Sequence, residues 1–135
     1  MYLLDTNILL ELLLDQDNAD QVERFLLSAP RENIFLSEFS LYSLGIVLLR
    51  KNLLGVFIQL VDDLLLQGGI RLARLGPEEM SILVDNVNRF GLDFDDAYQY
   101  QYTAAQLRKL SIISFDGDFD KTELGRKTPS EVMQV

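Results

Sequence analysis

Several acidic residues of this sequence stand where a short apolar run ends or where a helix is predicted to begin. The carboxyl ends of parallel strands meet at one edge of a sheet, where ligands bind, so these acids predict one shared site. A carboxylate with apolar neighbours is costly unless a cation meets it, and Mg²⁺ and Mn²⁺ prefer oxygen ligands. The acids placed in this way are Asp5, Glu38, Asp96 and Asp116.

A cluster of carboxylates can do chemistry of its own with a bound divalent metal. The metal makes a water molecule easier to deprotonate and polarises a phosphoryl oxygen, which is sufficient for phosphodiester hydrolysis. Each acid also has an ordinary structural interpretation. Asp5 could simply cap a helix, and Asp96 could simply complement the dipole of a helix start. If the acids lie close together in the folded protein, a metal site is the better interpretation, because acids that only cap helices need not meet.

Composition restricts the chemistry further. The chain has 135 residues with no His and no Cys, which excludes Ser-His-Asp catalysis, thiolate chemistry and most zinc sites. Its net charge of −9 argues against a plain basic surface for nucleic acid, unless bound cations or a basic partner offset the charge. The apolar runs are too short to span a membrane, and the N-terminal stretch lacks the pattern of a signal peptide. We therefore expect a cytoplasmic protein without a membrane segment.

The elements that must position the acids alternate between strand and helix. Strands are predicted over 2–4, 34–36, 70–75 and 111–115, and helices over 8–14, 19–28, 38–51, 53–67, 77–90, 94–109 and from 129 onward. This alternation predicts a single α/β domain over residues 1–135, with a central parallel sheet between two layers of helices. The strand over 70–75 alternates apolar and basic residues, as expected of an edge strand.

Four segments resemble the motifs of the PIN domain family, in the right order and spacing along the whole chain. Tyr2-Leu3-Leu4-Asp5-Thr6-Asn7-Ile8-Leu9 resembles the family's opening, and Asp96-Ala97 its acid at a helix start. The stretch 112–119 (Ile-Ile-Ser-Phe-Asp-Gly-Asp-Phe) resembles the motif that carries its last acid, and 128–131 resembles its tail. PIN domains are small metal-dependent ribonucleases, found among the toxins of bacterial toxin–antitoxin pairs.

The resemblance implies a three-layer α/β/α PIN-like fold and a Mg²⁺- or Mn²⁺-dependent endoribonuclease that cleaves RNA. It implies that Asp5, Asp96 and Asp116 are catalytic metal ligands, with Asp118 and Asp93 as candidate additional acids. Thr6, Asn7 and Ser114 would orient them. The implied partners are the RNA substrate and an antitoxin protein, and exposed apolar residues between Leu41 and Leu66 could serve an antitoxin helix or a homodimer.

The sequence departs from the family pattern at one position. Ser43 stands where the family usually has a Glu, and a hydroxyl is a far poorer metal ligand than a carboxylate. Glu38 or Glu11 could substitute, the site could hold one metal, or the protein could be catalytically weak. The alternative to an active nuclease is therefore an inactive PIN-like module that binds RNA or protein, with exposed Arg71, Arg74, Arg108 and Lys109 as phosphate contacts.

Overall fold

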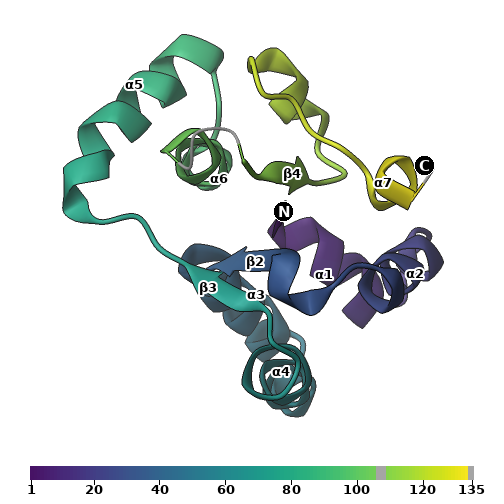
Figure 1. Ribbon diagram of the computed structural model, residues 1–135. Coiled ribbons are helices and arrows are strands. Elements are labelled where there is room, and N and C mark those ends of the chain that lie inside the picture. Colours follow the sequence, from purple (N-terminus) through teal and green to yellow (C-terminus); the bar gives the residue numbers. More distant parts are fainter. Residues whose placement is uncertain (106–108, 134–135) are drawn as a thin grey trace.

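A computed structural model describes residues 1–105 and 109–133. Four short strands form one sheet in the order β3-β2-β1-β4, and every neighbouring pair is parallel. The strands are β1 (Tyr2–Leu4), β2 (Ile34–Ser37), β3 (Arg71–Ala73) and β4 (Ser111–Ile113). The predicted α/β fold with a parallel sheet is confirmed, and β3 lies at an edge as its alternating sequence predicted (Figure 1).

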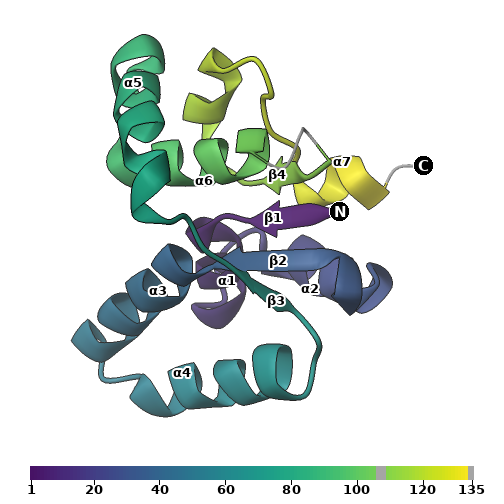
Figure 2. The same ribbon diagram turned by 60° about the vertical axis from the view of Figure 1, so that its left-hand side comes forward.

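Seven α-helices connect and cover the strands in the described part of the chain (Figures 1 and 2). They are α1 (Thr6–Leu13), α2 (Ala19–Ser28), α3 (Glu38–Arg50), α4 (Leu54–Leu60), α5 (Met80–Phe90), α6 (Phe94–Ala105) and α7 (Pro129–Met133). Shorter helical turns lie at Arg31–Asn33, Pro77–Glu79 and Gly117–Lys121, and α4 continues as a π-helix over Val61–Leu66.

The helices bury two separate apolar clusters. The larger cluster lies between the sheet and α1 to α4 and includes Leu4, Ile8, Phe25 and Leu36. The smaller cluster lies around α5 and α6 and includes Leu83, Ala97 and Tyr100. In Figure 2 α6 lies beside β4 and α5 packs on α6, whereas α3 packs on β2 and α4 packs on α3. The end of β1, in the middle of the sheet, is therefore approached by both groups of helices.

Most predicted boundaries agree with the structure, and the differences have local causes. The first helix begins at Thr6 rather than Ile8, because the Asp5 carboxylate accepts a hydrogen bond from the Thr6 N–H and caps the helix itself. The last strand ends at Ile113, because the Ser114 N–H pairs with the Lys127 carbonyl instead of a neighbouring strand. The predicted inward residue Leu107 and the basic residue Arg108 lie outside the described residues.

The turn between α5 and α6 sets where the aspartates of α6 begin. Gly91 ends α5 with a φ of 65°, in the left-handed region that glycine adopts at little cost. Leu92 is buried next to it, so the chain turns back at once and α6 starts at Phe94. Within the described ranges, no helix is both long and apolar enough to cross a lipid bilayer.

Candidate metal centre

Asp5 stands at the carboxyl end of the central strand β1 and is held by two hydrogen bonds. One carboxylate oxygen accepts from the Thr6 N–H at 2.8 Å, and the other accepts from the Ser114 hydroxyl at 2.7 Å. The side chain of Asp5 is only 5% exposed. Because a carboxylate has about four acceptor positions, these two bonds fix its orientation and leave lone pairs free for a further partner.

Ser114 links the ends of β1 and β4. Its hydroxyl accepts from the Asn7 side-chain amide at 3.2 Å and from the Asp116 N–H at 2.9 Å, while it donates to Asp5. Asn7 also accepts from the Phe115 N–H at 3.3 Å. The three residues predicted to orient the acids, Thr6, Asn7 and Ser114, thus all contact an acid or its immediate neighbours.

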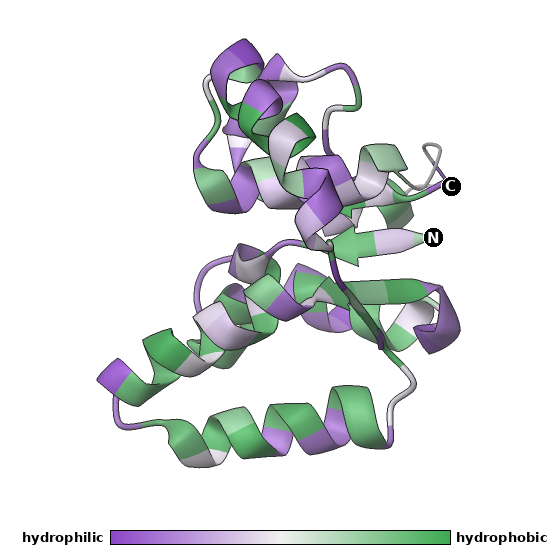
Figure 3. Cartoon of the chain, turned by 90° about the vertical axis from the view of Figure 1, so that its left-hand side faces the viewer, coloured by the Kyte–Doolittle hydropathy of each residue, from purple (hydrophilic) through white to green (hydrophobic). Residues whose placement is uncertain are grey.

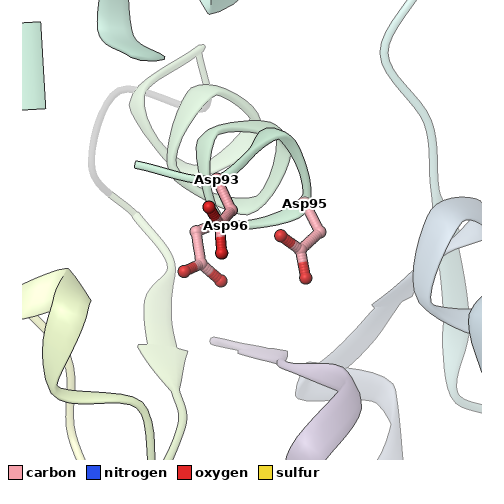
Figure 4. Close-up of side chains that lie close together, drawn as sticks. All are labelled: Asp93, Asp95 and Asp96. Carbon is pink, nitrogen blue, oxygen red and sulfur yellow. The ribbon is translucent and has the colours of Figure 1, made fainter. Parts of the chain in front are cut away.

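Asp96, Asp116 and Asp118 come together from two separate elements. Asp96 lies in the first turn of α6, and the other two lie at the start of the turn after β4. One carboxylate oxygen of each lies within 4.8 Å of the others. Asp116 accepts from the Asp118 N–H at 2.9 Å, and Asp118 also pairs with Lys121 at 3.3 Å. Figure 4 shows the side chains of Asp93, Asp95 and Asp96 close together at the start of α6.

Burial and the crowding of carboxylates raise two pKa values in this cluster. Burial raises the pKa of Asp5 to about 6, against the lowering effect of its hydrogen bonds, and the charges of Asp95 and Asp116 raise it further. Burial also raises the pKa of Asp96 to about 8, together with the charges of Asp5, Asp95 and Asp116. Protonated Asp96 is further stabilised by a hydrogen bond to Asp116. A bound cation would relieve this repulsion.

A buried polar chain lies beneath the acids. The Thr6 hydroxyl donates to the Ser40 hydroxyl at 2.9 Å, and the Gln99 amide donates to the same oxygen at 2.5 Å. This chain joins α1, α3 and α6, and Gln99 is 1% exposed. The Gln99 carbonyl oxygen (Oε1) has no hydrogen-bond partner among the described residues, which is unusual for a buried polar atom.

The two acids that could substitute for a Glu at position 43 lie elsewhere. Glu38 begins α3 and pairs with Arg74 at 3.8 Å. Glu11 accepts a hydrogen bond from the Asn18 N–H at 3.1 Å and so ties the end of α1 to the following loop. Among the described residues, neither belongs to a group of three clustered carboxylates. Ser43 is half-buried on α3.

Sequence reasoning did not single out Asp95, Ser40 or Gln99. A usable signal was present on α6, where Asp96, Gln99 and Thr103 recur at i, i+3 and i+7 and are all buried. Such spacing places them on one helix face, so a polar stripe on an inward face indicates a buried polar network. No pattern along the chain indicates that Ser40 of α3 meets this stripe.

The fold and the acidic cluster define a small α/β domain with an oxygen-rich site at the carboxyl edge of a parallel sheet. The family model described as "PIN domain" matches residues 2–124, and this chain belongs to the PIN domain family. No curated protein matches the sequence.

Two solved structures share the fold. VapC20 of Mycobacterium tuberculosis, a toxin that cleaves the sarcin–ricin loop, aligns with a TM-score of 0.77 at 16% identity, over 92% of this chain and 96% of that one. A toxin–antitoxin complex from Klebsiella pneumoniae contains a chain that aligns with a TM-score of 0.72 at 18% identity, over 96% of this chain and 98% of that one.

Proposed function

We propose that this protein is a Mg²⁺- or Mn²⁺-dependent endoribonuclease and the toxin of a toxin–antitoxin pair. The observation that carries the proposal is the convergence of Asp96, Asp116 and Asp118 from two elements, beside a buried Asp5 whose pKa is raised by burial and further by the charge of Asp116. Membership of the PIN family supports the nuclease class. The two similar structures, a toxin that cleaves the sarcin–ricin loop and a chain of a toxin–antitoxin complex, support the toxin assignment.

The residues fit a hard divalent cation. Every donor in the cluster is a carboxylate oxygen, and the sequence offers no His or Cys that would favour zinc or another soft metal. Burial, and then the charges of neighbouring carboxylates, raise the pKa of Asp96, so a bound cation would stabilise its charged form. Asp5, Asp96 and Asp116 would hold the cation, with Asp118 at its margin.

In the proposed reaction a water molecule attacks an RNA phosphodiester and the leaving oxygen departs with a proton. The cation would make that water easier to deprotonate and would neutralise the phosphate. Thr6 and Ser114 keep both oxygens of Asp5 in one orientation, so little reorganisation is needed on binding. Asp96 has a pKa of about 8 without the cation and would release its proton as the cation binds.

Cleavage of fluorescently labelled RNA oligonucleotides, with Mn²⁺ or with EDTA, tests this function. Asp96→Asn should lower the rate by about 100-fold or more, because it removes a charged donor from the cluster. Asp85→Asn, which removes an exposed acid of α5, should stay within about twofold of wild type. An Asp96→Asn variant as active as wild type would refute the assignment. If the wild type binds RNA but cleaves none with Mn²⁺, the chain is instead an inactive RNA-binding module, the alternative that Ser43 raises.

For the antitoxin we propose an amphipathic helix that binds beside α4. Side chains of α1, α4 and the π-helix line a pocket of about 390 Å³, chiefly Leu12, Leu13, Val56, Leu60 and Leu64. Exposed apolar residues continue along α3 and α4 at Ile46, Leu49, Leu54 and Ile58, and Figure 3 shows both helices as mostly hydrophobic. An apolar helix face laid in such a groove is a common mode of recognition.

Co-purification with the product of the neighbouring reading frame tests this partner. Val56→Arg, which places a charge in the pocket, should weaken the complex by about tenfold or more. Val84→Arg, on the exposed side of α5, should leave it intact. If Val56→Arg instead converts a dimer of the isolated protein into a monomer, the same surface is a homodimer interface.

A further inference from the structure

Phe94 is the first residue of α6, and the roles described so far do not include it. All eight phenylalanines of the chain lie in its described part, and Phe94 alone among them is exposed, at 48%. Among the described residues, neither of the two apolar clusters includes it. Packing of the core therefore accounts for only part of the surface of this ring.

Two other aromatic rings hold Phe94 in place. The ring centroid of Phe39, in the first turn of α3, lies 6.1 Å from that of Phe94 and 5.5 Å from that of Tyr98. Tyr98 is buried, and its hydroxyl accepts from the Leu75 N–H at 2.8 Å. These spacings are typical of interacting aromatic pairs. Because neighbouring rings already support Phe94, little conformational freedom is lost when a ligand stacks on it.

The supported ring borders the proposed cation site. Phe94 is two residues before Asp96, and helix geometry places their Cα atoms about 5 Å apart. On the other side, Phe39 precedes Ser40, whose hydroxyl accepts at 2.9 Å from the hydroxyl of Thr6 at the end of β1. The exposed ring thus lies within reach of a nucleotide whose phosphate is bound at the carboxylates.

A nucleobase is the part of RNA that suits this surface. The net charge is −9, and Arg74 is paired with Glu38, the residue before Phe39, so little positive potential is available for phosphate. The uncharged π face of a base is not repelled in this way, and stacking on aromatic side chains is a recurrent mode of single-strand recognition. A base inside a duplex has both faces covered, so only an unpaired or extruded base can stack here.

We propose that Phe94 stacks on an unpaired nucleobase of the RNA, beside the phosphate that is cleaved, and that Phe39 supports the ring. The inference rests on the proposed function, because that function supplies the RNA. It narrows the substrate class to RNA with an unpaired nucleotide at the position of cleavage. Every base has a π face, so this contact selects for exposure of the base rather than for its identity.

The competing explanation is that Phe94 only packs against Phe39 at the start of α6. An apolar side chain of similar size would then serve equally well, and the affinity for RNA would not depend on its bases. Phe94→Leu separates the two explanations, because it keeps an apolar side chain but removes the π face. Phe94→Tyr keeps the π face and adds a hydroxyl that solvent can reach at this exposed position.

Fluorescence anisotropy in Mn²⁺ with two labelled dodecamers tests the proposal. One dodecamer is an adenosine RNA with phosphorothioate linkages, which resists hydrolysis. The other carries the same linkages on tetrahydrofuran spacers and has no bases. We expect Phe94→Leu to raise the Kd for the adenosine RNA by about tenfold, the contribution of one stacked base, and to leave the Kd for the spacer chain within about twofold. Phe94→Tyr should stay within about threefold of wild type on both probes.

Ile82→Ala is the matched control, since Ile82 is 50% exposed but belongs to α5. It should change neither Kd by more than about twofold. Circular dichroism and thermal unfolding of each variant check that the fold is intact.

Three results would overturn the inference. Phe94→Leu could bind the adenosine RNA as wild type does, or it could weaken both probes equally, which would place its effect on the fold or on phosphate contacts. It could also leave RNA binding intact and weaken only the complex with the product of the neighbouring reading frame, which would make the ring a protein contact.

The same measurements separate this inference from the proposed function. If the wild type cleaves RNA in Mn²⁺ and Phe94→Leu matches its affinity for both probes, the nuclease function stands and only the stacking contact fails. If binding depends on Phe94 and on the bases but no RNA is cleaved, the stacking contact stands and the nuclease function fails.

Discussion

Asp5 and Asp96 are built into the fold in a way that disfavours their charged forms. Both are nearly buried, at 5% and 3% exposure, and both have raised pKa values. Hydrogen bonds from Thr6 and Ser114 offset part of this cost for Asp5 only. The residues that would bind a cation are thus a source of instability in its absence, a common feature of functional sites.

The stability of the metal-free protein should therefore fall as pH rises. An acid with a raised pKa binds more protons in the folded than in the unfolded state, so the free energy of unfolding decreases from about pH 4 to about pH 8. Asp5, with a pKa of about 6 against 3.8, contributes on the order of 2–3 kcal/mol to this loss. Urea unfolding in EDTA at pH 5, 6.5 and 8 measures this loss of unfolding free energy. Asp5→Asn should flatten the profile, and a wild-type stability that rises with pH would contradict the prediction.

Binding of Mn²⁺ should restore the stability that the protein loses when these carboxylates are charged. A cation that binds only the folded state at 100 times its Kd adds about 2.7 kcal/mol. The increase in Tm should be larger at pH 8 than at pH 5.5, because protons compete for Asp5 and Asp96 at low pH. Thermal unfolding with and without Mn²⁺ at both pH values checks this. An increase that is equal at the two pH values would place the cation away from these acids.

At the scale of elements, α6 is the helix on which the site depends, and polar contacts hold it. The Tyr98 hydroxyl accepts from the buried Leu75 N–H at 2.8 Å, just after the edge strand β3. Gln101 accepts from Asn86 of α5 at 2.8 Å and donates to Glu79 at 2.7 Å. These bonds lie on the opposite flank of the helix from Asp96 and Gln99, and they fix its rotation about its own axis.

Tyr98→Phe should consequently destabilise the protein by about 1–3 kcal/mol, because it leaves the buried Leu75 N–H without an acceptor. Tyr42→Phe removes a hydroxyl from an exposed tyrosine of α3 and should cost less than about 0.5 kcal/mol. Chemical denaturation of the two variants makes the comparison. Equal stabilities would show that a water molecule satisfies the Leu75 N–H in the variant.

The ends of helices were predictable from the sequence where nearby residues determine them. Ser37 caps α3, Gly91 ends α5, and Thr128 and Glu131 form the predicted capping box of α7. It was less predictable which residues of different helices and strands come into contact. The resemblance implied that Asp5, Asp96 and Asp116 would gather, but Ser40 meets Gln99 only because α3 packs against α6. The π-helical continuation of α4 also has no sequence signal comparable to a cap.

For the molecule as a whole, the net charge of −9 would oppose the approach of the proposed RNA substrate. Cations near the site are paired with acids: Arg74 with Glu38, Lys121 with Asp118, and Arg126 with Asp120. Such pairing leaves little positive potential for phosphate. The protein is therefore expected to depend on divalent ions for RNA binding as well as for chemistry.

RNA affinity should fall by about tenfold or more when Mn²⁺ is replaced by EDTA. Fluorescence anisotropy of a phosphorothioate-substituted RNA that resists hydrolysis measures binding without cleavage. Asp96→Asn should bind this RNA equally weakly in both conditions. Metal-independent binding by the wild type would show that basic side chains, rather than a bound cation, hold the phosphates.

The edges of the sheet also limit the kind of partner that can bind. At β4 the outer edge is occupied by the chain itself, because Lys127 pairs with Ile113 and its backbone bonds both Ile112 and Ser114. At β3 the open edge is three residues long and begins with an exposed Arg71, a combination that discourages strand-to-strand association. An extended peptide would gain few main-chain hydrogen bonds at either edge, so β-augmentation is a poor route for a partner to bind. A protein partner such as the proposed antitoxin would instead have to recognise side chains, which would tie its specificity to sequence.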